Sequence, residues 1–206
     1  MGLSSWWAVG ALSDEEVAEL APVAGPVIRE MGESTSARDA WSRWERDAAR
    51  GDGAVPVWRP DGYNTEEALH LYDMVNASAF DALDGSCALH IMEWWERFDE
   101  DVEPSITSVR KDNPVAALFH GLGPRRARVL PGWAGDAVLT AAEVRHHLEA
   151  VESVLALSGA ERKLVLRRIE DWPGDKEPVG ILDHPLRVWR QAAAAGLGLL
   201  SCRIWF

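Results

Sequence analysis

Apolar positions at strand spacing open the chain, and a capped helical pattern follows them. The stretch SSWWAV predicts a short buried strand that begins near Ser4. Ser13 and Glu16 have the spacing of a capping box, so a helix should begin directly after Ser13. Pro22 and Pro26 should then interrupt this helix, because proline cannot donate the helical hydrogen bond.

Helical spacing of apolar residues dominates the rest of the chain, usually with a polar cap before it or a glycine after it. The expected helices are 37–50, 64–75 with Asn64 as cap, 82–98, 113–121 with Asn113 as cap and Gly121 as stop, 140–157 opened by Thr140 and Glu143, 158–171 opened by Ser158 and Glu161, and 183–196 with Asp183 as cap and Gly196 as stop. An edge strand is expected at 55–58, and LGLLSCRIWF should form a C-terminal strand. The pattern predicts one helix-rich α+β domain over residues 1–206, with a small antiparallel or mixed sheet that involves both termini.

The composition is that of a globular protein, and its charge limits the class of partner. The 206 residues are 47% hydrophobic and carry a net charge of −12. Nucleic acids and anionic membranes attract basic surfaces, so neither is an expected partner. Eleven tryptophans indicate a core built around indole rings.

The cysteines and the N-terminal residues bear on the compartment. Cys87 and Cys202 are too few for a disulfide framework or a metal cluster. The N-terminal residues lack the basic and apolar regions of a signal peptide, and no apolar run has the length of a membrane span. We therefore expect a cytoplasmic protein, and its arginine-rich, lysine-poor composition is typical of a high-GC bacterial genome.

The stretch DALDGSCALHIMEWWERFDEDVE holds the main candidate site residues. On a helix, His90, Glu93 and Arg97 share one side, opposite the apolar face. His90 with Glu93 or Asp84 could act as an acid–base pair, while Trp94 and Arg97 could contact a ligand. The same spacing also fits a solvated helix face with an ion pair, so both interpretations stay open.

Two Glu-x-x-His pairs, Glu67/His70 and Glu143/His146, give a further hypothesis. Two such pairs contribute ligands to the di-metal centre of ferritin-like bundles. The apolar faces of the two helices, however, lie on the side opposite His70 and His146. We therefore expect no metal site there, and a di-metal oxidase is the second alternative function.

Charge is unevenly distributed in the middle of the chain. Residues 93–103 carry six carboxylates against one arginine, and residues 110–128 are mainly basic. Such segments are commonly solvated patches, but the acidic one could also dock a charged partner.

Motifs for nucleotide binding, serine hydrolysis and zinc proteolysis are absent from the sequence. The chain has no phosphate-binding loop, no Gly-x-Ser-x-Gly elbow and no His-Glu-x-x-His helix. No cofactor is therefore expected.

Three stretches resemble the YfbM-like proteins. MGLSSWWAVGALSDEEVAEL is similar to the family's start, with Met-Gly, a short aromatic strand and a capped helix. LDGSCALHIM resembles its Leu-Asp-Lys-x-Trp-x-x-Leu-His segment: Leu83, Asp84, Leu89 and His90 match, and Cys87 stands near the expected tryptophan. GDAVLTAAEVRHHLEAV and VWRQAAAAGLGLLSC are similar to its late helices and closing strand. The resemblance implies a small cytoplasmic α+β protein and no particular activity.

The expected function is binding or regulation of a protein partner or small-molecule ligand, for example the neutralisation of a toxin by the acidic segment. The first alternative is an enzyme acting on a small metabolite in bacterial secondary metabolism, with His90 as its acid or base.

Overall fold

The computed structural model describes residues 4–50, 58–59, 62–63, 65–83, 87–110 and 112–205, and for residues 58–59, 62–63, 82 and 87–90 it describes the backbone alone. In chain order, the helices and strands of this part are β1 (Ser4–Leu12), α1 (Asp14–Glu33), α2 (Thr35–Arg50), β2 (Trp58–Arg59), β3 (Gly62–Tyr63), α3 (Glu66–Val75), the 3-10 helix η1 (Ala79–Ala82), α4 (Cys87–Trp95), β4 (Ser105–Arg110), α5 (Pro114–Leu122), α6 (Pro124–Ala127), β5 (Ala137–Leu139), α7 (Ala141–Leu155), α8 (Gly159–Asp171), α9 (Pro178–Ala195) and β6 (Gly198–Trp205).

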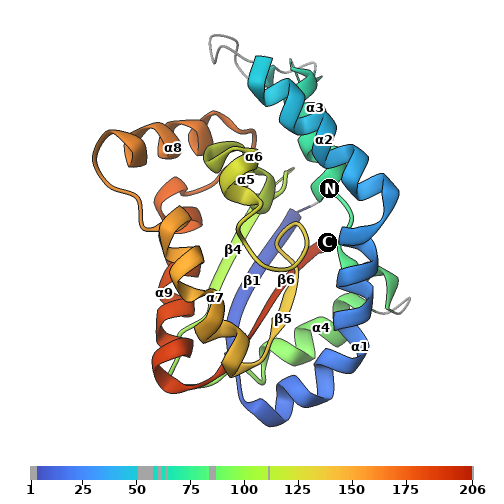
Figure 1. Ribbon diagram of the computed structural model, residues 1–206, viewed down its shortest axis with the longest axis vertical. Coiled ribbons are helices and arrows are strands. Elements are labelled where there is room, and N and C mark those ends of the chain that lie inside the picture. The colour runs from blue at the N-terminus through green and yellow to red at the C-terminus, as the bar shows by residue number, and fades with distance from the viewer. Residues whose placement is uncertain are drawn as a thin grey trace.

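The central feature is a four-stranded antiparallel sheet in the order β4-β1-β6-β5 (Figure 1). Strand β1 lies between β4 and the C-terminal strand β6, so Trp7 is opposite Thr107 on one side and Arg203 on the other. The short strand β5 pairs with the outer edge of β6. The predicted helix-rich α+β fold with both terminal strands in one sheet is confirmed.

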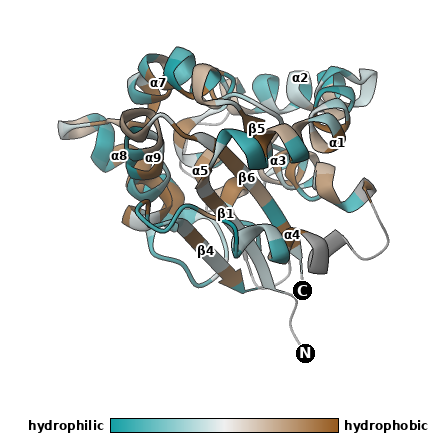
Figure 2. Cartoon of the chain, turned by 90° about the horizontal axis from the view of Figure 1, so that it is seen from below, coloured by the Kyte–Doolittle hydropathy of each residue, from teal (hydrophilic) through white to brown (hydrophobic). Residues whose placement is uncertain are grey.

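Helices cover both faces of the sheet, because alternate side chains of each strand point to opposite sides. Trp7 and Val9 belong to a large core cluster that includes residues of α2, α3, α5, α7, α8 and α9. Ala8 and Leu12 belong to a second cluster with residues of α1, η1 and α4. Figure 2 shows apolar colour along the strands and hydrophilic colour on the outer turns of α2 and α7. Among the described residues, no helix combines the length and apolar character needed to cross a membrane.

The first helix begins as predicted but does not stop at its prolines. Ser13 Oγ accepts a hydrogen bond from the Glu16 amide at 3.3 Å, and Glu16 Oε2 accepts one from the Ser13 amide at 2.9 Å. Pro22 and Pro26 lie inside α1, and both are exposed. The carbonyl groups one turn earlier lose their helical donors on this same outer side, where water can replace them.

The helix expected over 82–98 is shorter, and its buried face is turned. Residues before it form η1, and α4 ends at Trp95. Ile91, Trp94 and Phe98 are buried, whereas Met92 is 37% exposed. Trp94 therefore belongs to the buried side of this segment, and Met92 points outward.

Helix ends were predicted with mixed success in the second half of the chain. Asn113 caps α5, and the Thr140–Glu143 capping box opens α7, as expected. The stop of α5 is Gly123 (φ 75°) instead of Gly121, because Gly123 alone of the two has a positive φ. Gly196 ends α9 in the left-handed region, as expected.

Three other predicted caps were wrong or lie elsewhere. Asp183 does not begin the last helix, because α9 starts at Pro178 and Asp183 instead binds Arg162 through two contacts of 2.6 Å. Ser158 precedes α8, as predicted, but makes no side-chain capping hydrogen bond. Asn64 lies outside the described residues, and the side chain of Thr65 caps α3. Of the edge strand expected at 55–58, only residue 58 is described, in β2.

Candidate functional site

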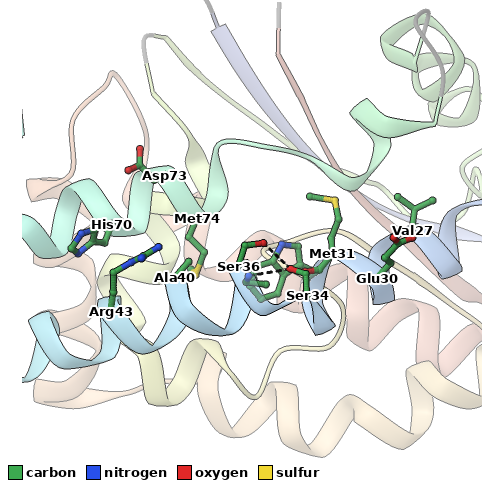
Figure 3. Close-up of a pocket in the computed structure, with 12 residues that line it drawn as sticks. Val27, Glu30, Met31, Ser34, Ser36, Ala40, Arg43, His70, Asp73 and Met74 are labelled. Atoms are coloured by element: carbon green, nitrogen blue, oxygen red, sulfur yellow. Dashed lines mark hydrogen bonds between the residues drawn. The ribbon is translucent and has the colours of Figure 1, made fainter.

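A groove of about 570 Å³ lies where the end of α1, the first half of α2 and the end of α3 meet (Figure 3). Its floor is apolar, with Met31 from α1, Met74 from α3 and Trp133 from the loop before β5. Its polar groups come from three helices, which hold Glu30, Arg43 and His70 at its edges. A concave site with an apolar lining and a few polar groups is the usual form of a ligand-binding site.

Ser34 sets the junction between α1 and α2. Its Oγ donates to the Met31 carbonyl at 2.8 Å, which closes the last turn of α1, and accepts from the Ala37 amide at 3.0 Å, which opens α2. One side chain therefore satisfies backbone groups at both helix ends. Ser34 and Ser36 hydroxyls lie 3.0 Å apart beside the groove (Figure 3).

Helix α2 packs on α3 through one face. Ala37, Trp41 and Trp44, at spacings of four and three residues, are buried. Trp41 and Trp44 belong to the same core cluster as Leu71 and Met74 of α3. This packing turns the opposite, polar side of α2 outward and leaves Arg43 at the edge of the groove.

A histidine–carboxylate pair joins α2 to α3 at the Arg43 end of the groove. Asp47 Oδ2 lies 2.7 Å from His70 Nδ1, and because an ionised carboxylate can only accept, the Nδ1–H group donates. In the neutral form of the ring, Nε2 is then the nitrogen that carries no proton. Figure 3 shows Arg43 and His70 next to each other on facing helices. Arg43 can pair with an anion at this end, where the carboxylate of Asp73 also lines the groove, and Nε2 can accept a proton.

The other end of the groove has the opposite charge. Glu30 extends from α1, near Val27, and in Figure 3 it lies across the apolar floor from Arg43. From Ser34 to Arg43 the helix rises about 14 Å, at about 1.5 Å per residue. The groove is thus an elongated apolar surface with Glu30 at one end and Arg43 at the other, and a second carboxylate, Asp73 of α3, lines it on the Arg43 side (Figure 3).

Trp133 is held in the groove by a tight turn. The Trp133 and Asp136 backbones exchange two hydrogen bonds of 2.8 Å, and the two residues between them, Ala134 and Gly135, have φ values of 49° and 94°. Two positive φ values in this position are the signature of a type I′ turn. The turn ends in the fully buried Asp136, which is ion-paired to Arg203 of β6 at 2.8 Å. The sheet therefore fixes the position of Trp133.

Of the residues predicted as a site on the segment around residue 90, Glu93, Trp94 and Arg97 are not among the described residues that line this groove. Glu93 is exposed, and Trp94 is a core residue with 4% exposure. Arg97 lies 4.3 Å above the Trp94 ring, and its Nη1 is 2.8 Å from Glu19 Oε2. Asp84 lies outside the described residues, as does the side chain of His90, so their pairing stays a prediction.

The two Glu-x-x-His pairs serve other contacts. Glu67 Oε1 lies 3.6 Å from His120 Nδ1 and 3.3 Å from Arg168 Nη2, while His70 turns to Asp47. Burial alone would raise the pKa of Glu67, but the nearby imidazole of His120 and the charge of Arg168 together outweigh it and lower the pKa. Glu67 and His70 therefore contact different partners and do not converge on a common position.

Glu143 is held in the capping box of α7, whose backbone and side-chain hydrogen bonds with Thr140 lower its pKa. His146 is exposed and packs against His147 with ring centres 5.0 Å apart. Within the described ranges, no three histidine, cysteine or carboxylate side chains converge as a metal site would require. The di-metal hypothesis is not supported.

Sequence reasoning singled out His70 but missed its partner and the groove. Asp47 and His70 are 23 residues apart and meet only because α2 packs on α3. The local signal was a polar stripe on each helix, which is also the signal of an ordinary solvated face.

The chain was compared with family models, with curated proteins and with solved structures. None of the three comparisons gave a match.

Proposed function

We propose that this protein binds a short apolar peptide with free ends, or a chain end of that kind, in the groove between α1, α2 and α3. The observation that carries the proposal is the charge pattern: Glu30 and Arg43 stand at opposite ends of an apolar floor. Glu30 would receive the amino terminus and Arg43 the carboxylate. The stretch of about 14 Å from Ser34 to Arg43 alone corresponds to roughly four extended residues at 3.3–3.6 Å each.

Calorimetric titration with the tetrapeptide Ala-Val-Leu-Ala tests the proposal. The free peptide is compared with its N-acetylated and C-amidated forms, each of which removes one terminal charge. Each blocked peptide should bind about five- to tenfold more weakly, which corresponds to about 1 kcal/mol for a partly exposed charge pair. Equal affinity for the three peptides would refute the proposal.

Matched variants assign each end of the peptide. Arg43→Gln should abolish the difference in affinity between the free and the C-amidated peptide. Glu30→Gln should abolish the difference in affinity between the free and the N-acetylated peptide. Arg46→Gln and Glu33→Gln change exposed residues on the same helices that do not line the groove, so they serve as controls. A loss of affinity as large in the controls would indicate a general charge effect.

The His70–Asp47 pair supports a second candidate, an enzyme that uses His70 Nε2 as a general base at the same groove. This changes the residue expected to carry the alternative from His90 to His70. Product formation from the tetrapeptide, followed by mass spectrometry, should be lost in His70→Gln and kept in His146→Gln, which changes an exposed histidine on α7. An intact peptide after prolonged incubation contradicts hydrolysis and leaves binding.

The acidic surface supports a further candidate, capture of a basic protein partner such as a toxin. Its exposed carboxylates come from α1 and from the segment around α4: Glu15, Glu19, Glu93, Glu96, Glu100, Asp101 and Glu103. Capture of a basic partner from the native host should weaken with salt and with Glu96→Lys plus Glu100→Lys. Asp99 is a poorer position for charge reversal, because its Oδ1 accepts from the Asp101 amide at 3.0 Å. Capture unaffected by both changes would dismiss this candidate.

A further inference from the structure

A second cavity, of about 450 Å³, lies beside the first and is bounded by α2, α5, α6 and the loop before β5. The two share only Ala37 and Trp133 among their lining residues. Its volume is within the range of about 300–1,000 Å³ that is usual for small-molecule sites.

The walls of this cavity are aromatic. Trp41 packs against Phe119 with ring centres 6.2 Å apart and an interplanar angle of 69°, and against Trp133 at 6.1 Å and 51°. Trp41 and Phe119 are almost fully buried, so both rings are fixed by the core behind them. Rigid tilted rings offer edge and face contacts to a planar aromatic ligand without a loss of side-chain freedom.

The charge of the lining is opposite to that of the protein. Arg38 and Arg128 line the cavity, and none of its described lining residues is a carboxylate, although the whole chain carries −12. Arg128 lies 5.3 Å above the Trp41 ring, and its Nη2 is 3.3 Å from Glu45 Oε2. Arg38 is exposed at the side of the cavity. Aromatic walls beneath guanidinium groups select a planar ligand with negative charge.

We propose that this second cavity binds a planar aromatic carboxylate, with its ring against Trp41 and Trp133 and its carboxylate at Arg38. The proposal does not depend on peptide binding in the first groove, because it requires Arg38, whereas peptide binding requires Arg43.

The probe is 2-naphthoate, with 2-naphthylmethylammonium as a cation of similar size and shape. Binding is followed by saturation-transfer NMR of the probe and by titration of the protein's indole N–H signals. We expect saturable binding of 2-naphthoate and binding of the cation at least about tenfold weaker, because the charge at the arginines reverses from attraction to repulsion. No saturable binding up to about 10 mM, or equal binding of the two probes, would overturn the proposal.

Three arginine variants test where 2-naphthoate binds. Arg38→Gln should weaken 2-naphthoate binding about five- to tenfold. Arg46→Gln, on the same helix outside both cavities, and Arg43→Gln, in the first groove, should leave it unchanged within about twofold. An unchanged affinity in Arg38→Gln, or an equal loss in Arg43→Gln, would contradict the assignment. Peptide binding depends on Arg43 and naphthoate binding on Arg38, so failure of one proposal is distinguishable from failure of the other.

Discussion

Replacing Asp136 by asparagine should destabilise the protein more than any surface charge change, because its carboxylate is fully buried and accepts five hydrogen bonds. Oδ1 accepts from the backbone amide and Nε of Arg203, each at 3.1 Å. Oδ2 accepts from Arg203 Nη2 at 2.8 Å, from the Ala79 amide at 2.8 Å and from Ser78 Oγ at 3.0 Å. The carboxylate thus joins β6, the turn that carries Trp133 and the start of η1.

The magnitude follows from the donors that lose an acceptor. Asparagine has one side-chain oxygen in place of two, so its NH2 group must face either the two donors at the Oδ1 position or the three donors at the Oδ2 position. In both orientations the Arg203 guanidinium, which is 1% exposed, loses its counter-charge. Removing one member of a buried ion pair destabilises by about 3–5 kcal/mol, a large part of the usual 5–15 kcal/mol of a domain.

Urea unfolding followed by tryptophan fluorescence at pH 7 measures this loss. Asp183→Asn is the matched control, because Asp183 also holds an arginine, Arg162, but at a partly exposed position, where about 1 kcal/mol or less is expected. The double variant Asp136→Asn/Arg203→Met should lose less than the sum of the single variants, because no unpaired charge remains. A loss in Asp136→Asn no larger than in the control would refute the reasoning.

Two further predictions concern the core and the pH dependence of stability. Glu67→Gln should destabilise by about 1–3 kcal/mol at pH 7, because His120 and Arg168 lose an ionised partner. The folded pKa of Glu67 lies below its ordinary value of 4.5, so its contribution is present above about pH 4.5 and is lost as the pH falls through the folded value. Urea midpoints of protein and variant should therefore converge below that pH, and a constant gap from pH 7 to pH 3.5 would contradict this. Gly10→Ala should cost about 1–3 kcal/mol by thermal unfolding, because the added Cβ would lie 2.4 Å from the Phe98 ring; an unchanged melting temperature would show that the ring moves freely.

Most of the fold could be predicted from the sequence, because the terminal strands and the helix caps are marked by local signals. Ser13, Asn113, Thr140 and Gly196 each mark a helix end through contacts with residues two to four positions away. The sequence pattern does not predict strand β4, because only Ser105 and Val109 of its six residues are buried and apolar residues hardly alternate along it.

The candidate site was less predictable because it is made by tertiary packing. Asp47 meets His70 across two helices, and Trp133 reaches the groove through a turn with Ala134 at positive φ, where asparagine or glycine is the usual signal. The segment around residue 90 had a strong local charge pattern. Its Trp94, however, contributes to the core, and Glu93 and Arg97 lie on the outside.

Methionine-methyl NMR tests the central claim, that the groove between α1, α2 and α3 is a ligand site, most directly. Of the four methionines, Met31 and Met74 line the groove, and Met92 on α4 is exposed away from it, as an internal control. We predict that Ala-Val-Leu-Ala shifts the methyl signals of Met31 and Met74 saturably and leaves that of Met92 unchanged, and that Arg43→Gln requires more peptide for the same shifts. Unchanged Met31 and Met74 signals at high peptide concentration, or an equal shift of Met92, would contradict the account.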